Sequence, residues 1–112
     1  AIHDAWHLGR PVFHPAADTF ADGLATRNTY PFTFGALQAG LAGFVAVTDG
    51  AIAEALRLVL ASTHTLVEGA GAAGLAGLLA LREELAGKTV AVVLSGANID
   101  AETLRRVLAR EI

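Results

Sequence analysis

The feature that most constrains this chain is an unbroken apolar, largely β-branched run at residues 89–94 (TVAVVL). A run of this length without polar alternation is typical of a strand buried on both faces, as in a parallel sheet. An Ala- and Leu-rich stretch, residues 72–85, comes before it and predicts a helix, with Gly87 just past the helix end. A helix followed by a buried strand predicts an α/β arrangement.

Shorter apolar segments predict the remaining elements. A second strand is expected at residues 44–47, before a helix that is capped by Asp49 and has its apolar face from Ile52 onward. Asp100 is expected to cap the last helix. The expected helices cover residues 1–8, a segment starting near Phe20, residues 34–41, a segment from Ile52 closed by residues 62–64, residues 72–85 and residues 101–111.

This order of elements predicts the α/β fold class, with a partial parallel sheet of two or three strands and packed helices. With 112 residues the chain has room for one domain at most, so we expect residues 1–112 to form a single partial domain. A sheet this narrow leaves an edge unpaired unless further strands come from elsewhere. Because the chain contains no methionine, we expect it to be a piece of a longer protein.

Composition argues against several classes of function. The net charge is −3 and no basic run occurs, so we expect no nucleic-acid partner. Cysteine is absent, which leaves no disulfide framework and no cysteine zinc site. No apolar run reaches the ~18 residues that a membrane span needs, so we expect no membrane partner and a cytoplasmic protein.

Two histidines near the start invite a metal interpretation. His3 and His7 are four residues apart and would share one face of a helix, a spacing that suits two metal ligands. No pattern places a third ligand beside them. The sequence therefore favours a solvated helix face and predicts no metal site.

Gly69, Gly71 and Gly74 allow two interpretations. In the first they form the GxGxxG loop of a dinucleotide-binding domain, where glycines let a pyrophosphate approach a helix N-terminus. In the second they are close-packing glycines at a helix start beside a cofactor ring. Glu68 disfavours the first, because its carboxylate would repel a pyrophosphate, and no acid stands about 20 residues further on to meet the ribose.

The predicted strand at residues 89–94 ends in Ser95, Gly96, Ala97 and Asn98, which place a hydroxyl and an amide at its carboxyl end. In open α/β sheets, ligands bind at that edge. Ser95 is therefore a candidate binding residue, and a plain strand-end cap is the alternative role for it.

Three segments resemble motifs of one enzyme family. Residues 19–25 (TFADGLA) resemble T-[IF]-A-D-G-[IL]-A, residues 67–72 (VEGAGA) resemble V-E-P-A-G-A, and residues 93–100 (VLSGANID) resemble V-L-S-G-G-N-[IV]-D. These are motifs of threonine and serine dehydratases and serine racemases, which are pyridoxal-phosphate enzymes of the tryptophan synthase β-like fold (fold type II). Their order and spacing agree with the family across nearly the whole chain. Gly69 replaces a proline and Ala97 a glycine, and neither departure removes a reactive group.

The resemblance implies a cofactor, pyridoxal 5'-phosphate, and residues that contact it. Ser95, followed by Gly96, would hydrogen-bond the pyridine nitrogen, and Glu68 and Gly69 would line the pocket beside the ring. A serine hydroxyl does not protonate that nitrogen, so the ring would be a weaker electron sink than one paired with an aspartate.

The resemblance also implies that the reactive lysine is missing. Lys88 is the only lysine, and it precedes the predicted strand whose other end carries Ser95, about 20 Å away. The family's Schiff-base lysine and its metal-ligating acid lie upstream of the matching region, so we expect no catalytic residue and no metal ligand in this chain. We expect the chain alone to bind no cofactor and to be inactive.

The leading hypothesis for function is thus the C-terminal part of a larger domain. The full protein would be a threonine or serine ammonia-lyase that converts a hydroxy amino acid to a 2-oxo acid and ammonia, acting on a small-molecule substrate as a homo-oligomer. An amino-acid racemase of the same fold is the first alternative. A non-catalytic folded fragment and the dinucleotide-binding module are the others.

Overall fold

The structure, a computed structural model, describes residues 1–112 and divides the chain into two compact units. The first unit is Ala1–Thr19 with Leu24–Ala46, and the second is Phe20–Gly23 with Val47–Ile112. None of the helices combines the length and the apolar character needed to span a membrane.

The first unit is built on two helices, α1 (Ile2–Leu8) and α2 (Pro31–Gly40). Helix α1 is followed by Gly9, whose φ of 66° forms a left-handed cap. Helix α2 begins at Pro31 instead of Phe34, because a proline fits the first helical position, where no backbone donor is needed. The indole of Trp6 ties the helices together by donating to the carbonyl oxygen of Leu37 at 3.3 Å.

The segment between these helices holds the one isolated β-bridge, an antiparallel pairing of Phe13 with Asn28. The expected helix near Phe20 is wrong except for a short 3₁₀ turn, η1 (Asp22–Leu24). The backbone N–H of Phe20 donates instead to the carboxylate of Asp49 at 3.2 Å. Gly23 also disfavours a longer helix, since glycine has a low helix propensity.

Three helices form the second unit: α3 (Asp49–Thr63), α4 (Gly69–Ala80) and α5 (Ala101–Leu108). The cap of α3 is Thr48, whose hydroxyl accepts from the N–H of Ala51 at 3.2 Å, so the prediction that Asp49 caps it is wrong by one residue. The cap of α5 is Asp100 as predicted, with Oδ1 accepting from the N–H of Thr103 at 2.9 Å.

Helix α4 is shorter at its end than the sequence predicts. It stops at Ala80, and residues 81–87 form turns that end at Gly87 with a φ of 75°. The charged side chains in this stretch, at residues 82–84, are exposed. They have no apolar face to bury, so packing does not extend the helix through them.

The core of the second unit is made of small and branched apolar residues. Leu56 of α3 and Val107 of α5 are the largest fully buried side chains. Ala72 and Ala76 of α4 are buried against the same cluster, which also includes Ala53 of α3. Their short side chains let the helix backbones approach closely.

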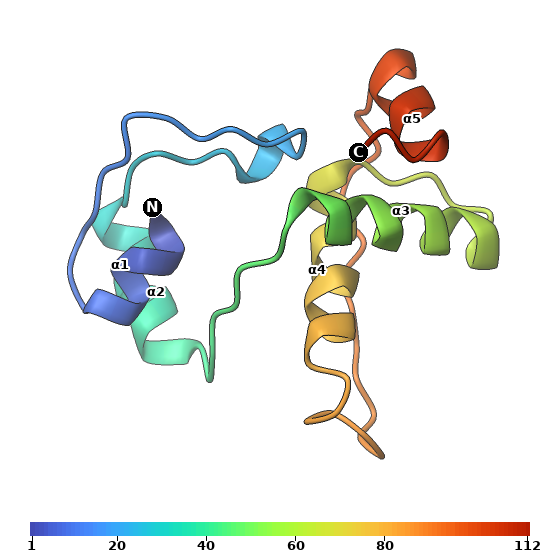
Figure 1. The fold of residues 1–112 in the computed structure, drawn as a ribbon. Helices are drawn as coiled ribbons and strands as arrows, with labels where there is room; N and C mark the ends of the chain where they lie inside the picture. Colours follow the sequence, from blue (N-terminus) through green and yellow to red (C-terminus); the bar gives the residue numbers. More distant parts are fainter. The chain divides into compact units, whose positions relative to one another are not determined.

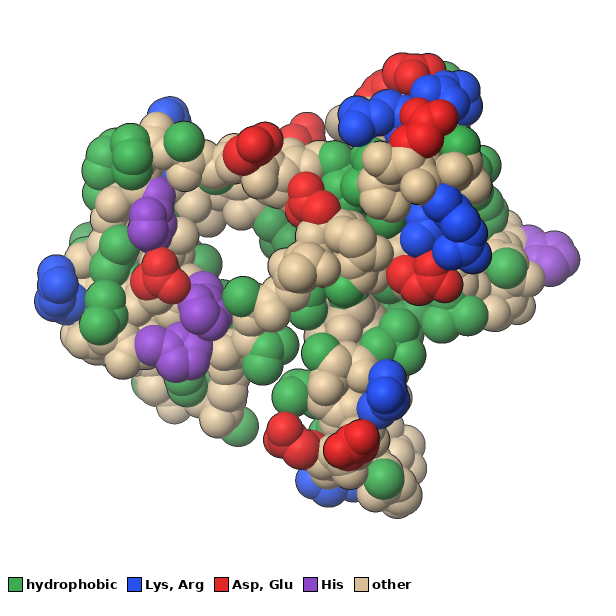
Figure 2. Space-filling model, in the orientation of Figure 1, with side chains coloured by type: hydrophobic (Ala, Val, Ile, Leu, Met, Phe, Trp, Pro, Cys, Tyr) green, Lys and Arg blue, Asp and Glu red, His purple; other side chains and the backbone are tan.

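Hydrogen bonds and ion pairs of arginine side chains form a clamp that holds α5 on α3. Arg57 donates to the carbonyl oxygen of Val107 at 2.6 Å and to the carboxylate of Glu54 at 2.7 Å. Arg110 also reaches Glu54, at 3.2 Å, whereas Arg105 pairs with Glu102 and Glu111 within α5 and the residues just after it. Figure 2 shows the blue and red side chains gathered over these helices. The clamp fixes the helix that follows the Ser95 segment.

The structure corrects the prediction of strands at residues 44–47 and 89–94, because neither forms one. A strand exists only when its backbone donors and acceptors pair with a neighbouring strand, and residues 1–112 supply no such neighbour. Residues 88–100 instead run beside α4 as an irregular segment (Figure 1), with Val93 79% exposed. The partial parallel sheet is therefore not confirmed, and the structure is rich in α-helix.

Asp100 should make stability depend on pH. Hydrogen bonds from Thr103 hold the pKa of its carboxyl below the usual value. The contribution of this cap is therefore complete above the unfolded-state pKa of about 3.9 and is lost as the pH falls through the lower folded-state value. In urea unfolding, Asp100→Ala should be less stable than wild type at about pH 7, and the difference should shrink at about pH 2. A difference that stays constant would contradict the charged cap.

Candidate functional site

The segment around Ser95 and Gly96 packs directly against the first turns of α4. Gly71 allows this contact, because a Cβ on it would clash with the carbonyl oxygen of Ser95 and lie 3.0 Å from that of Gly96. One turn later, a Cβ on Gly74 would be 3.3 Å from the side chain of Val92. The glycine face of α4 thus fixes where the Ser95 segment runs.

Glu68 joins the same segment to the start of α4. Its backbone N–H donates to the carbonyl oxygen of Gly96 at 3.2 Å. Gly96 has a φ of 69°, and a Cβ there would clash with Oε1 of Glu68. The position therefore requires glycine both for its backbone conformation and for the approach of the carboxylate.

Gly69, the first residue of α4, is buried against a different segment of the chain. A Cβ on it would lie 2.8 Å from the ring of Phe20 and 3.0 Å from Cβ of Ala21. Nearby, a Cβ on Gly23 would lie 2.9 Å from Cβ of Ala70. Parts of all three motif segments noted in the sequence therefore meet at the N-terminal end of α4.

Of the four predicted cofactor-binding residues, the structure brings Glu68, Ser95 and Gly96 together, and Gly69 lies next to Glu68 at the buried start of α4. Ser95 is exposed, and its hydroxyl makes no hydrogen bond within the chain. Their role toward a cofactor stays a prediction.

The three glycines of the GxGxxG spacing all lie inside α4, since the helix begins at Gly69. In a dinucleotide-binding domain the first of them would form the turn before the helix. Gly69, Gly71 and Gly74 instead each receive a neighbouring backbone or side chain. The structure therefore favours the close-packing interpretation.

Lys88 lies away from this group. It is exposed and follows the turns at residues 81–87, and its N–H donates to the carbonyl oxygen of Leu85 at 3.0 Å. These turns are at the far end of α4 from Glu68 (Figure 1). A helix of 12 residues is about 18 Å long, which separates the only lysine from Ser95.

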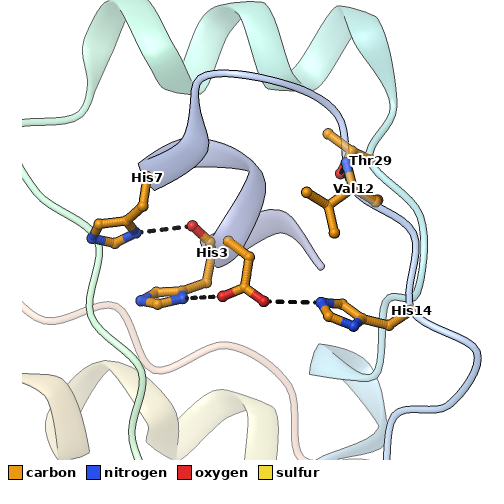
Figure 3. A network of polar contacts seen from close by, with 6 residues as sticks. His3, His7, Val12, His14 and Thr29 are labelled. Carbon is orange, nitrogen blue, oxygen red and sulfur yellow. Dashed lines mark hydrogen bonds and ion pairs between the residues drawn. The ribbon is translucent and has the colours of Figure 1, made fainter.

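A separate polar cluster lies in the first unit (Figure 3). The carboxylate of Asp4 accepts from Nδ1 of His3 at 2.8 Å and from Nε2 of His14 at 2.9 Å, and these bonds lower the pKa of Asp4. Nδ1 of His7 contacts the carbonyl oxygen of His3 at 2.9 Å. No group of three or more side chains is arranged to hold a metal ion. No sequence pattern indicates the pairing of Asp4 with His14, because ten residues and a loop separate them.

Comparison with known proteins identifies the family. The sequence model of the family described as pyridoxal-phosphate dependent enzyme matches residues 1–96. A comparison with curated protein sequences gives no match.

Solved structures resemble the chain in both fold and sequence. Threonine deaminase from the organism abbreviated T.th. is 34% identical, with a TM-score of 0.82 over 88% of this chain and 35% of that one. The processed form of threonine deaminase isoform 2 from Solanum lycopersicum is 32% identical, with a TM-score of 0.85 over 96% and 32%. Serine racemase from Dictyostelium discoideum is 27% identical, with a TM-score of 0.77 over 88% and 31%. The chain thus spans about a third of the length of the proteins it matches.

Gly71→Ala tests the close approach. The added methyl group would meet the backbone of Ser95, which cannot yield as a side chain can, so we expect a loss of about 1–3 kcal/mol in the free energy of unfolding. Gly35→Ala is the matched control, because Gly35 is also helical and has no atom within 4 Å of an added Cβ. It should stabilise by up to about 1 kcal/mol through helix propensity. Equal effects in urea unfolding would contradict the packing role of Gly71.

Proposed function

Because the chain belongs to the family of pyridoxal-phosphate-dependent enzymes, we propose that it is the C-terminal third of a threonine or serine ammonia-lyase. The full protein would convert the hydroxy amino acid to a 2-oxo acid and ammonia. The observation that carries the proposal is the meeting of Glu68, Ser95 and Gly96 at the start of α4. Two threonine deaminase structures above 30% identity support the choice of reaction.

The residues at this corner fit the ring of pyridoxal phosphate. The Ser95 hydroxyl is exposed and unpaired, so it is able to donate to a ring nitrogen without losing another bond. Gly96 offers a bare backbone beside it, and the Glu68 carboxylate packs against that backbone. Ser95, Gly96, Glu68 and Gly69 are the residues we propose to hold the ring.

When bound, the cofactor supplies an electron sink for the charge that develops at the substrate α-carbon. Ser95 would donate its hydroxyl proton in a hydrogen bond to the pyridine nitrogen and keep it, because a serine hydroxyl is not an acid at neutral pH. The sink is then only moderately strong, which suits loss of the α-proton coupled to departure of the β-hydroxyl. Glu68 would orient a water molecule or a ring substituent through its carboxylate oxygens.

The chain alone is proposed to be inactive. A lysine must hold the cofactor covalently and move the α-proton. Lys88 is too far from Ser95 for that role, as its place beyond the far end of α4 indicates. The reactive lysine would be supplied by the rest of the protein.

A serine racemase is the second candidate. The 27% identity to the Dictyostelium discoideum enzyme favours it, and the same corner would serve both reactions. A homo-oligomer, a cytoplasmic location and a small amino-acid substrate complete the proposal.

The absorbance spectrum tests whether a lysine of this chain binds the cofactor. With added pyridoxal phosphate, residues 1–112 should show no band at about 410–420 nm, where the family's lysine-bound cofactor is expected to absorb. Lys88→Ala should give the same spectrum as wild type. A band that appears with wild type and is lost in Lys88→Ala would show that Lys88 binds the cofactor, and it would contradict the absence of a binding lysine.

Activity assays on the full-length protein test the proposed reaction. We expect it to release 2-oxo acid and ammonia from threonine or serine, and Ser95→Ala should reduce the rate by about 10–100-fold through weaker cofactor positioning. Ser62→Ala, an exposed serine near the end of α3, is the control that should leave the rate unchanged. Formation of D-serine without 2-oxo acid would overturn the lyase in favour of the racemase.

A further inference from the structure

His3 and His7 form a pair with defined tautomers. Their ring centres are 4.3 Å apart on successive turns of α1. Nδ1 of His3 faces a carboxylate oxygen of Asp4, and Nδ1 of His7 faces the carbonyl oxygen of His3. Both partners only accept, so each Nδ1 must be the donor. In each neutral ring Nε2 therefore keeps a free lone pair.

The two free nitrogens lie on the same side. Figure 3 shows the rings one above the other, with the second nitrogen of each pointing away from His14. Metal-binding histidines have this arrangement, in which one ring N–H is held by a carboxylate or a carbonyl and the other nitrogen is left for the ion. His3 and His7 thus each have the supporting hydrogen bond that orients a metal ligand.

Aromatic neighbours hold the rings in place. His3 makes an edge contact with Phe44 at 5.7 Å between ring centres, and His7 makes one with Trp6 at 4.9 Å. The indole of Trp6 is in turn fixed by its bond to Leu37. An ion would therefore meet rings that are already oriented.

Ring spacing indicates which ion fits. A ligating nitrogen lies about 2 Å from the metal, which places the ring centre about 3 Å from it. For an ion that both Nε2 atoms reach, two ring centres 4.3 Å apart would enclose an angle of about 90°, closer to the tetragonal geometry of Cu²⁺ than to a tetrahedron. Cu²⁺ is also the divalent ion that nitrogen ligands bind most strongly.

We propose that His3 and His7 bind one Cu²⁺ ion through their Nε2 atoms, with water in the other positions. The Asp4 carboxylate supports the site through its bond to His3 and adds a negative charge nearby. This site uses two protein ligands, lies in the first unit and does not depend on the proposed enzymatic function. The sequence predicts a solvated helix face at these histidines. The proposal adds that this face presents two oriented nitrogen atoms that are able to bind a metal ion.

Trp6 reports on the site, because it is the only tryptophan and contacts His7. Cu²⁺ should quench its fluorescence with saturation at one equivalent. The N-terminus is acetylated in this experiment, since a free α-amine two residues before a histidine chelates Cu²⁺ by itself. His3→Gln and His7→Gln should each weaken binding by at least about tenfold, because each loses a direct ligand.

His64→Gln is the matched control, since His64 is exposed and lies at the end of α3. It should bind Cu²⁺ as wild type does. Circular dichroism verifies that His7→Gln keeps its helix content, which an exposed position allows. Unchanged Cu²⁺ affinity in His7→Gln, or an equal loss in His64→Gln, would overturn the paired site.

Discussion

The close approach of the Ser95–Gly96 backbone to helix α4 is the contact on which the rest of the second unit depends. Gly71 provides the space, because any side chain there would meet the carbonyl oxygen of Ser95. The N–H of Glu68 then holds Gly96 from the helix start, and the left-handed φ of Gly96 turns the backbone past the Glu68 carboxylate. Small residues at these positions are therefore a steric requirement.

This contact and its neighbours bring the three motif segments together at the start of α4. Phe20 and Ala21 cover Gly69, so the first motif segment seals one side of the helix start while the third forms the other. Helix α5 follows immediately after the Ser95 segment and is clamped to α3 by Arg57. The Ser95 backbone is therefore held by its contact with Gly71 and by the fixed helix that follows it.

Much of the helical structure could be predicted from the sequence, since caps such as Gly9 and Asp100 act locally. The strands could not, because residues 89–94 have strand composition but a strand also needs partners from outside the local sequence. The three motifs indicated which residues gather at the start of α4. The reasons that glycine is needed at 69 and 71 came only from the tertiary contacts, and the bridging of His3 and His14 by Asp4 likewise depends on a loop that no local pattern describes.

The most direct test is a crystal structure of the full-length protein with pyridoxal phosphate bound. We predict that Oγ of Ser95 lies within about 3 Å of the pyridine nitrogen, with the backbone of residues 95 and 96 still against Gly71. A Ser95 side chain turned away from the ring, or another residue paired with that nitrogen, would contradict it.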